Sequence, residues 1–527
     1  MTRRLGWYLV IAMLAGCARC GERPAPEPRA VERVLGRGAV GVVVVPQLAS
    51  LGQKLVLFEQ LKVAAFLAPT QGFQDPRALV DALVGELGVD VRSAAALEKF
   101  GLDGQAPLGV GVQVTGHAYV ALPVKDPSKL QASLAALATR RLGASVAGEL
   151  TVDGVVVKTF SREAKGPPRL GYALAHGFAL VAVDEGISDL AALASLPVGD
   201  SLAKEPALAR ARARVATGGD AFAYLPPGSP LLGEWPVESA LLVVTLEPTS
   251  FAVMLDAPWR AEAPMRALFE ASTEASELPT AMVPPDAFLV ARYDGPPKAL
   301  GPLWRQLFGR WMGQGGIDLE HDILSHLKPG VVGALSLAER PPLGRGLPTL
   351  DVRRTNPFDY LGLTGTAALD GPDGGVQALE TAAALAPRFG AQMKRADRAG
   401  ATVYLTSWSQ GEGVHFAVRG DRLYFAAPVD RLDRLLLADG TARAGERKPG
   451  GPTASVVLDL SKLSQSVRAL PESVWGLGGF ALKGTAVRWL DAIDDLKALT
   501  LEVSSKDQAG FARLALSLAP ASPKPAP

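Results

Sequence analysis

The chain repeats one order of predicted elements twice, over residues 30–258 and 278–520. Each copy opens with an apolar strand, at 39–44 and at 287–292. The same elements then follow in the same order in both copies. They are a strand leading into a helix, two strand segments with turn glycines, a short helix and two closing strands. A fold for one copy must therefore also suit the other, and the sequence predicts two related domains joined by a linker at 259–277.

The helix after the second matched strand has a clear start signal. The strand 119–124 is followed by Asp126 and Pro127, and the matching strand 363–369 is followed by Pro372. Aspartate is favoured at the N-cap, and proline suits the first helical position because its missing N–H has no partner there. One face of the first of these helices carries Leu130, Leu134 and Leu137.

Glycine turns mark hairpins after the helix in both copies. Strands begin beside a turn glycine at 151–157 and at 396–404. Gly177 and Gly420 interrupt the next apolar runs, and glycine supplies the positive φ that a tight hairpin turn requires. The remaining matched elements are short helices at 187–194 and 430–437 and closing strands at 221–225, 240–246, 454–460 and 498–503.

The predicted strands occur in neighbouring pairs with short turns, which favours antiparallel sheets over a doubly wound parallel one. We therefore expect an α+β protein in which each domain is a mainly antiparallel sheet with helices packed on one face. The copies differ in two places. The first has an added helical segment at 201–215, and the second has a long Pro-, Gly- and Arg-rich loop at 339–360.

The first residues form a processing signal rather than part of either domain. Arg3 and Arg4 precede the apolar run 5–14, which ends in Leu14-Ala15-Gly16-Cys17. The run is about half as long as the roughly 20 residues that a membrane-spanning helix needs. A basic segment, a short apolar core and small residues before a cleavage site are typical of secretory signals. An ordinary secretory signal with a chance cysteine and a buried apolar strand are the alternatives.

This segment resembles the signals of bacterial lipoproteins that signal peptidase II processes. The resemblance covers about the first twenty residues and implies that residues 1–16 are removed and that Cys17 carries acyl chains such as palmitate. Residues 17–29 are proline-rich and suit an extended tether. The resemblance further implies the outer membrane of the cell envelope, facing the periplasm, rather than the inner membrane, because Ala18 is not aspartate.

Composition gives no reason to expect a nucleic-acid partner. The chain has 54 basic and 53 acidic residues, and loss of Arg3 and Arg4 leaves a side-chain net charge of −1. The two cysteines are Cys17 and Cys20, so the mature chain has no internal disulfide framework. Cys20 is free or pairs between molecules. The residues 521–527 are predicted to be a disordered tail.

Three patterns that could indicate a cofactor or metal site have simpler explanations. The glycines of 36–41 precede a strand, whereas a dinucleotide fingerprint follows one. His321 and His326 are five residues apart, and a helix does not direct them at one ion as it does residues four apart. The acidic segment 370–375 has Pro372 at a position where a calcium loop needs an oxygen ligand.

The sequence likewise predicts no catalytic residues. Trp489 lies near Asp491, Asp494 and Asp495, but an amphipathic helix explains this group better than a pair of glycosidase carboxylates. No serine nucleophile elbow and no Gly-Lys-Ser/Thr phosphate loop occurs in the chain. We therefore expect no cofactor and no metal, and these patterns favour a protein without enzyme activity.

The chain also resembles duplicated bacterial envelope proteins whose domains are of unknown function. That resemblance rests on the pattern of elements and implies no catalytic residues. We expect a lipid-anchored binding or interaction module, with the membrane and an envelope protein as partners. An unrecognised envelope hydrolase and a carrier of an apolar ligand are the alternatives. A partner could be met by four arginines of the long loop, Arg340, Arg345, Arg353 and Arg354.

Overall fold

The structure is a computed structural model. It describes residues 30–215, 219–260, 266, 283–301, 318–338, 356–409, 411–438, 452–470, 479–506 and 509–519. These residues fall into two compact units, of which the first ends by residue 261 and the second lies within 262–519. The division between them falls within the segment 259–277.

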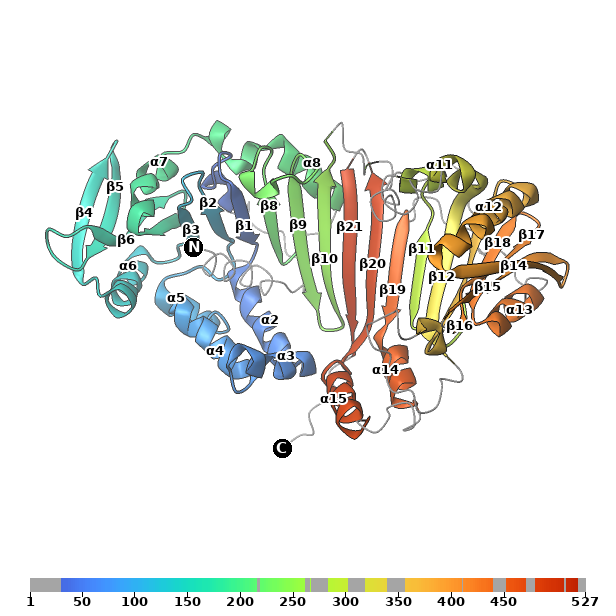
Figure 1. Cartoon of the computed structure of the whole chain (residues 1–527). Helices are drawn as coiled ribbons and strands as arrows, with labels where there is room; N and C mark the ends of the chain where they lie inside the picture. Colours follow the sequence, from blue (N-terminus) through green and yellow to red (C-terminus); the bar gives the residue numbers. More distant parts are fainter. Residues whose placement is uncertain are drawn as a thin grey trace. The chain divides into compact units, whose positions relative to one another are not determined.

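Unit 1 contains ten strands among its described residues, and neighbouring strands in it are antiparallel. The strands are β1 (Gly41–Val45), β2 (Leu108–Val112), β3 (Ala118–Pro123), β4 (Val146–Val152), β5 (Val155–Ser161), β6 (Pro168–Ala175), β7 (Phe178–Val183), β8 (Ala221–Leu225), β9 (Ala240–Glu247) and β10 (Ser250–Pro258). Their order in the sheet is β4-β5-β6-β7-β3-β2-β1-β8-β9-β10 (Figure 1).

The helices of unit 1 lie mainly between β1 and β2 and after β3 and β7. They are α2 (Leu48–Gln60), α3 (Lys62–Leu67), α4 (Pro76–Leu87), α5 (Ala94–Phe100), α6 (Pro127–Leu137), α7 (Leu190–Ala194) and α8 (Pro206–Val215), with a short 3-10 helix, η4 (Asp184–Asp189), leading into α7. Asp126 caps α6 as predicted, accepting hydrogen bonds from the backbone N–H groups of Ser128 and Lys129. Leu130 and Leu134 are fully buried.

Unit 2 has eleven strands among its described residues. They are β11 (Leu289–Tyr293), β12 (Leu327–Leu337), β13 (Leu361–Leu369), β14 (Ala391–Arg398), β15 (Ala401–Trp408), β16 (Gly411–Glu412), β17 (His415–Arg419), β18 (Arg422–Ala427), β19 (Ala454–Asp459), β20 (Leu496–Lys506) and β21 (Ala509–Leu518). The helices are α11 (Leu319–Asp322), α12 (Pro372–Leu385), α13 (Val429–Ala438), α14 (Leu460–Arg468) and α15 (Gly479–Ala492). The strand order is β14-β15-β17-β18-β13-β12-β11-β19-β20-β21, with β16 a short addition beside β15.

The two units have the same strand order, and their registers agree as well. A two-residue turn joins β4 to β5 and another joins β14 to β15, which places Val157 at the position of Val403. Val157 pairs with Ala173 on the next strand, and Val403 pairs with Ala417. Followed across the sheet strand by strand, the registers reach matching end pairs of the last two strands, Glu247 with Ser250 in unit 1 and Lys506 with Ala509 in unit 2.

Helices cover both faces of the sheet in unit 1, which corrects the expectation of helices on one face. Tyr172 of β6 lies in one apolar cluster with Leu130 of α6. The neighbouring Gly171 approaches Ile187 of η4 and Leu190 of α7 so closely that a Cβ there would lie 2.7 Å from Ile187. Because successive residues of a strand point to opposite faces, α6 and η4–α7 lie on opposite sides of β6 (Figure 1).

Unit 2 repeats this arrangement. Tyr404 of β15 packs with Leu379 of α12, whereas its neighbour Val403 packs with Leu432 of α13. The expectation of helices on one face arises because amphipathic spacing shows that a helix has an apolar side, but not which sheet face that side contacts. The coarser prediction, a mainly antiparallel α+β protein, is confirmed.

One match made on sequence is displaced by one residue in the structure. His176 and Gly177 form the β6–β7 turn, and Gly420 and Asp421 form the β17–β18 turn. Gly420 therefore corresponds to His176, one residue before Gly177, and both Gly420 and His176 have positive φ. The first strands match without such a shift, because the ladders place Val42 among its neighbours as they place Val290.

Candidate functional site

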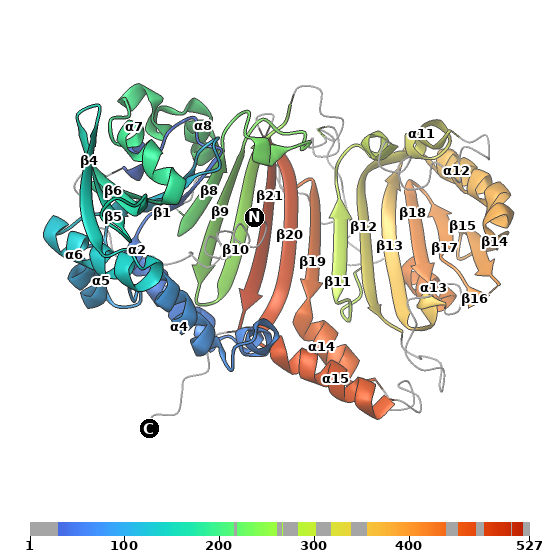
Figure 2. The same cartoon turned by 60° about the vertical axis from the view of Figure 1, so that its left-hand side comes forward.

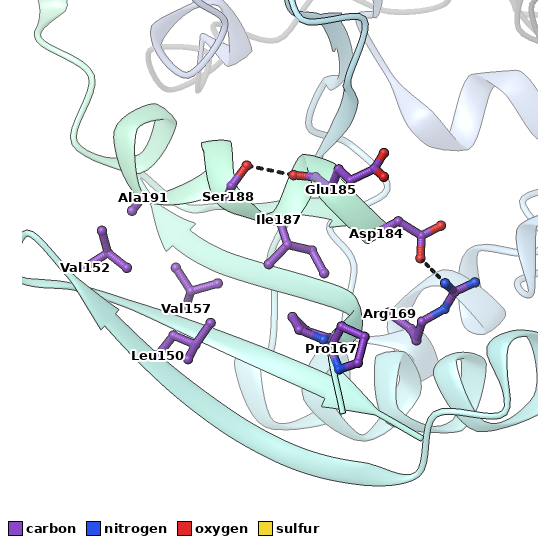
Figure 3. A pocket seen from close by; sticks show the side chains of 11 residues that line it. Leu150, Val152, Val157, Pro167, Arg169, Asp184, Glu185, Ile187, Ser188 and Ala191 are labelled. Carbon is purple, nitrogen blue, oxygen red and sulfur yellow. Dashed lines mark hydrogen bonds and ion pairs between the residues drawn. The ribbon is translucent and has the colours of Figure 1, made fainter. Parts of the chain in front are cut away.

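Unit 1 contains an open cleft of about 420 Å³ between the β4–β5 hairpin and the η4–α7 segment (Figure 3). Its walls are mainly aliphatic, and charged side chains gather at one end. This volume lies in the usual range of roughly 300–1,000 Å³ for sites that bind small molecules or single side chains. The lining residues are Leu150, Val152, Val157, Pro167, Pro168, Arg169, Asp184, Glu185, Ile187, Ser188 and Ala191.

The strand wall of the cleft follows from the register of the hairpin. Leu150 pairs with Val157, and Val152 pairs with Val155 two positions further on, so these side chains share one face. Val156 points to the other face although it is adjacent. The hairpin turn is Asp153-Gly154, with positive φ at both residues, which is the type I′ geometry that two-residue hairpins favour.

The opposite wall is held close to the sheet by a glycine. Gly171 of β6 lies beneath Ile187, and no side chain larger than hydrogen fits at that position without displacing it. Ile187 and Ala191 are both buried at 5% exposure or less. Asp184, where η4 begins, has a φ of +50°, an unusual value for a residue that is not glycine. The chain turns sharply there and brings the acidic end of η4 to the rim of the cleft.

The rim of the cleft carries one basic and two acidic side chains. Arg169 Nη1 lies 2.9 Å from Asp184 Oδ1, and both side chains are partly exposed (Figure 3). Arg169 Nε is buried without an acceptor among the described residues. Ser188 donates a hydrogen bond to the backbone carbonyl of Glu185, whose own carboxylate is exposed. Since Asp184 balances Arg169, the rim has an excess negative charge at Glu185.

The corresponding place in unit 2 is filled. Arg398 stands where unit 1 has Val152, and it forms an ion pair with Asp433 at 3.4 Å. Val403, at the position of Val157, is fully buried against leucines of α13. These leucines are Leu432, Leu435 and Leu436. The two units therefore share a strand order but differ in the side chains at this position, Val152 in unit 1 and the ion-paired Arg398 in unit 2.

Other ionisable groups of the described residues have structural partners rather than a shared site. Lys54 of α2 is almost completely buried and donates a hydrogen bond of 2.7 Å to the carbonyl of Leu246, with Asp220 Oδ1 at 3.7 Å. Burial lowers the pKa of Lys54 to about 8, against the opposing effect of Asp220. His117 Nδ1 lies 2.9 Å from Asp189 Oδ2.

His415 is the most deeply buried of the described histidines in the second unit. Its Nδ1 accepts a hydrogen bond from the backbone N–H of Thr406, which requires the unprotonated nitrogen at that position. Its Nε2 lies 3.4 Å from a carboxylate oxygen of Glu412. His415 is only 3% exposed, so a reactant could not reach its ring. Its hydrogen bond with Thr406 instead holds β17 against β15.

Among the residues singled out from sequence that the structure describes, His326 and the segment 370–375 lie side by side, with the backbone N–H of Asp370 donating to the carbonyl of His326, but they form no metal site. Cys17 and the four arginines of the long loop lie outside the described residues. His326 lies against Gly374 at the start of α12, and His321 is exposed on α11. Asp370 lies in the turn before α12, which agrees with the interpretation of 370–375 as a turn that leads into a helix. Trp489 and Asp491 are exposed on α15, and Asp491 forms an ion pair with Arg468.

Within the described ranges, no group of three or more His, Cys, Asp or Glu side chains is arranged to hold a metal ion. Among the same residues, no helix is long and apolar enough to cross a membrane. The sequence reasoning missed the cleft itself, because its walls come from separate hairpin and helix segments, each with single aliphatic residues. The one available signal was the run of valines on both sides of the Asp153-Gly154 turn.

Comparison with known proteins adds little. No protein-family model matches the chain. No curated protein matches it either. Among solved structures, crystal form IV of TP0453 shows 10% sequence identity and a TM-score of 0.23, covering 44% of this chain and 81% of that one. Crystal form I of TP0453 shows 12% identity and a TM-score of 0.24, covering 46% and 81%. Likeness at this level supports no inference about fold or function.

Proposed function

We propose that the protein is a lipid-anchored binding protein of the cell envelope, with Cys17 as its site of lipidation and the outer membrane as its location. Acyl chains on Cys17 stabilise membrane residence by about 0.8 kcal/mol for each buried methylene. The proline-rich segment 17–29 gives the domains reach from the membrane surface. The cleft of unit 1 then binds an apolar group of a partner molecule.

We also propose that the two units are related domains that arose by duplication. Their shared strand order and matching registers support this, because independent sheets of ten strands have many other orders available. Binding was retained or acquired in one copy. In the other, Arg398 and the leucines of α13 occupy the equivalent space.

The cleft is the observation that carries the proposal. Leu150 and Val152 are exposed by 47% and 44%, and they border a concavity whose floor is lined by the buried side chains of Val157 and Ile187. Aliphatic side chains gathered around one concavity mark binding sites more often than scattered exposed residues do. No histidine is among the lining residues, and Ser188 donates to the carbonyl of Glu185 and to the carboxylate of Asp189, so the serine lacks an imidazole base and binding is favoured over hydrolysis.

Two substitutions at equally exposed valines test the binding site. Val152 and Val156 are both 44% exposed on the same hairpin, but only Val152 faces the cleft. Nile red, an uncharged apolar dye, should bind the full-length protein, and Val152→Asp should weaken that binding about tenfold or more, because it places a charge on the apolar wall. Val156→Asp should leave binding unchanged. Equal effects of the two substitutions, or no dye binding at all, would contradict the proposal.

A further inference from the structure

The cleft lies beside an open sheet edge. β4 is the outermost strand of unit 1, and among the described residues no strand pairs with its outer side (Figure 2). Six of its seven residues are exposed. An exposed edge of this length presents unpaired backbone N–H and C=O groups, which are a template for an added strand.

The hairpin geometry identifies which backbone groups face outward. In a two-residue type I′ hairpin, the residues that flank the turn are hydrogen-bonded to each other, here Val152 and Val155. Hydrogen-bonded and non-hydrogen-bonded pairs alternate along an antiparallel ladder. Thr151, Glu149 and Ala147 therefore direct their N–H and C=O groups away from β5.

The equivalent edge of unit 2 is protected, whereas this one is not. β14 carries Lys394, Arg395 and Arg398, and charged residues, lysine above all, are the usual protection of an edge strand. The last two form ion pairs with Glu380 and Asp433. In β4 the matching positions are Gly148, Glu149 and Val152, so that one charge remains.

We propose that β4 binds an extended polypeptide segment of a partner protein as an additional strand, with apolar side chains of that segment entering the cleft. This inference rests on the proposed binding function of the cleft and names its occupant. Residues opposite Gly148 and Leu150 in an added strand would point to the cleft face, where Val152 and Val157 lie. The backbone supplies affinity and the cleft supplies selection of side chains.

The charge of Glu149 on β4 indicates which residue type the bound segment carries. It also argues against a second copy of β4 as the bound strand. The three outward-facing residues are centred on Glu149, so two copies of β4 pairing about a two-fold axis would place Glu149 opposite Glu149. Like charges directly opposite each other destabilise a ladder. A lysine or arginine opposite Glu149 would instead complement it, on the sheet face away from the cleft.

A designed peptide tests strand addition directly. The probe is the labelled nonapeptide Thr-Val-Thr-Val-Lys-Val-Thr-Val-Thr, which alternates apolar and polar residues around a central lysine. Fluorescence anisotropy with the full-length protein should show saturable binding. N-methylation of the lysine and the threonines two residues on either side should weaken binding about tenfold or more, because it removes N–H groups that face β4.

Two pairs of protein variants separate backbone pairing from side-chain contact. Thr151→Pro removes one outward N–H and should weaken peptide binding about tenfold, whereas Thr151→Val keeps it and should not. Glu149→Lys should reverse the preference, so that a peptide with glutamate in place of lysine binds better than the original. Thermal unfolding of each variant shows whether the domain is intact.

The outcomes distinguish this inference from the proposed function on which it rests. Nile red binding without peptide binding overturns strand addition and leaves the apolar cleft in place, whereas loss of both overturns both. Peptide binding that survives N-methylation and Thr151→Pro also overturns strand addition. Concentration-dependent dimerisation that Thr151→Pro abolishes would assign the edge to a second copy and equally overturn the inference.

Discussion

Val152 of unit 1 and Arg398 of unit 2 occupy the same position in the two units, since each directly precedes the two-residue turn of its outermost hairpin. Val152 lines an open cleft. Arg398 instead pairs with Asp433 of α13, beside a cluster of buried leucines. The two sheets thus differ at this equivalent position, which is apolar and open in unit 1 and charged and ion-paired in unit 2. We expect the function of the protein to depend on this difference.

Replacing Arg398 should not create a second binding site. Its ion pair with Asp433 is exposed on both sides, at 41% and 46%, and exposed pairs contribute about 0–1 kcal/mol. Arg398→Val should therefore lower the free energy of unfolding by less than about 1 kcal/mol. Nile red titration of the variant should match that of the wild type, because Leu432 and Leu435 fill the space behind the hairpin. A second class of dye sites would show that α13 is not the closing element.

The buried ion pair of unit 1 should behave differently from this exposed pair. Arg214 makes two hydrogen bonds of 2.6 Å to the carboxylate of Asp256, which is 1% exposed. Arg214→Met would leave that carboxylate buried without its guanidinium, which costs about 3–5 kcal/mol. Urea unfolding followed by far-UV circular dichroism measures the loss. A change as small as that of Arg398→Val would contradict the interpretation of Arg214 as a structural partner.

A methyl group at Gly171 should disturb the cleft from below. Its Cβ would lie 2.7 Å from Cγ2 of Ile187, so η4 must move away from β6. Overpacking of this kind costs about 1–3 kcal/mol, and we expect Gly171→Ala to lower both stability and Nile red affinity. Gly199→Ala is the matched control, because no atom lies within 4 Å of its added Cβ. If Gly171→Ala kept full dye affinity, the position of Ile187 would not define the site.

The buried Lys54 makes stability depend on pH in a defined direction. Burial lowers its pKa in the folded protein to about 8, from the ordinary lysine value of 10.5. Between these values the unfolded chain holds a proton that the folded chain has released, so the free energy of unfolding rises with pH. Below about pH 8 both states are protonated, and the cost of burying the charge is present in full.

A comparison with Lys54→Met isolates this effect. Between about pH 7.5 and 9.5, the wild type should gain roughly 1–2 kcal/mol in unfolding free energy relative to the variant. Higher pH is unsuitable, because burial raises the pKa of Tyr119 to about 12 and its ionisation in the unfolded chain then lowers stability. Parallel pH profiles of wild type and variant would show that Lys54 keeps an ordinary pKa.

The sequence predicts best those elements that carry their own boundary signals. The strand at 221–225 is found with the predicted limits, and Asp126 with Pro127 marks the start of α6 correctly. β2 is missed because Leu-Gly-Val-Gly-Val has two glycines, which usually weaken a strand. They are needed there for packing, since a Cβ on Gly111 would lie 2.5 Å from the ring of Tyr119.

The site is harder to predict than the strands because its parts meet only through the sheet order. Nothing in the sequence distinguishes Val152 and Ile187 from other aliphatic residues. They line the same cleft only because β5, β6 and η4 are neighbours in the folded unit. The alignment of unit 1 with unit 2 also cannot be fixed from the sequence alone. Matching glycine with glycine aligns Gly177 with Gly420, whereas the ladders align Gly420 with His176.

Lipidation is the prediction that sequence carries alone. If Cys17 is the acylated residue, Cys17→Ser should abolish incorporation of labelled palmitate and leave an unprocessed precursor that retains residues 1–16. Cys20→Ser is the control, because the cysteine three residues later lies outside the small-residue box and should be labelled and processed as the wild type is. Two or more acyl chains are needed for stable anchoring, so the Cys17 variant should also lose its membrane association at high salt, which removes electrostatic adsorption. Labelling that persists in Cys17→Ser would place the lipid elsewhere and remove the membrane anchor from the proposed function.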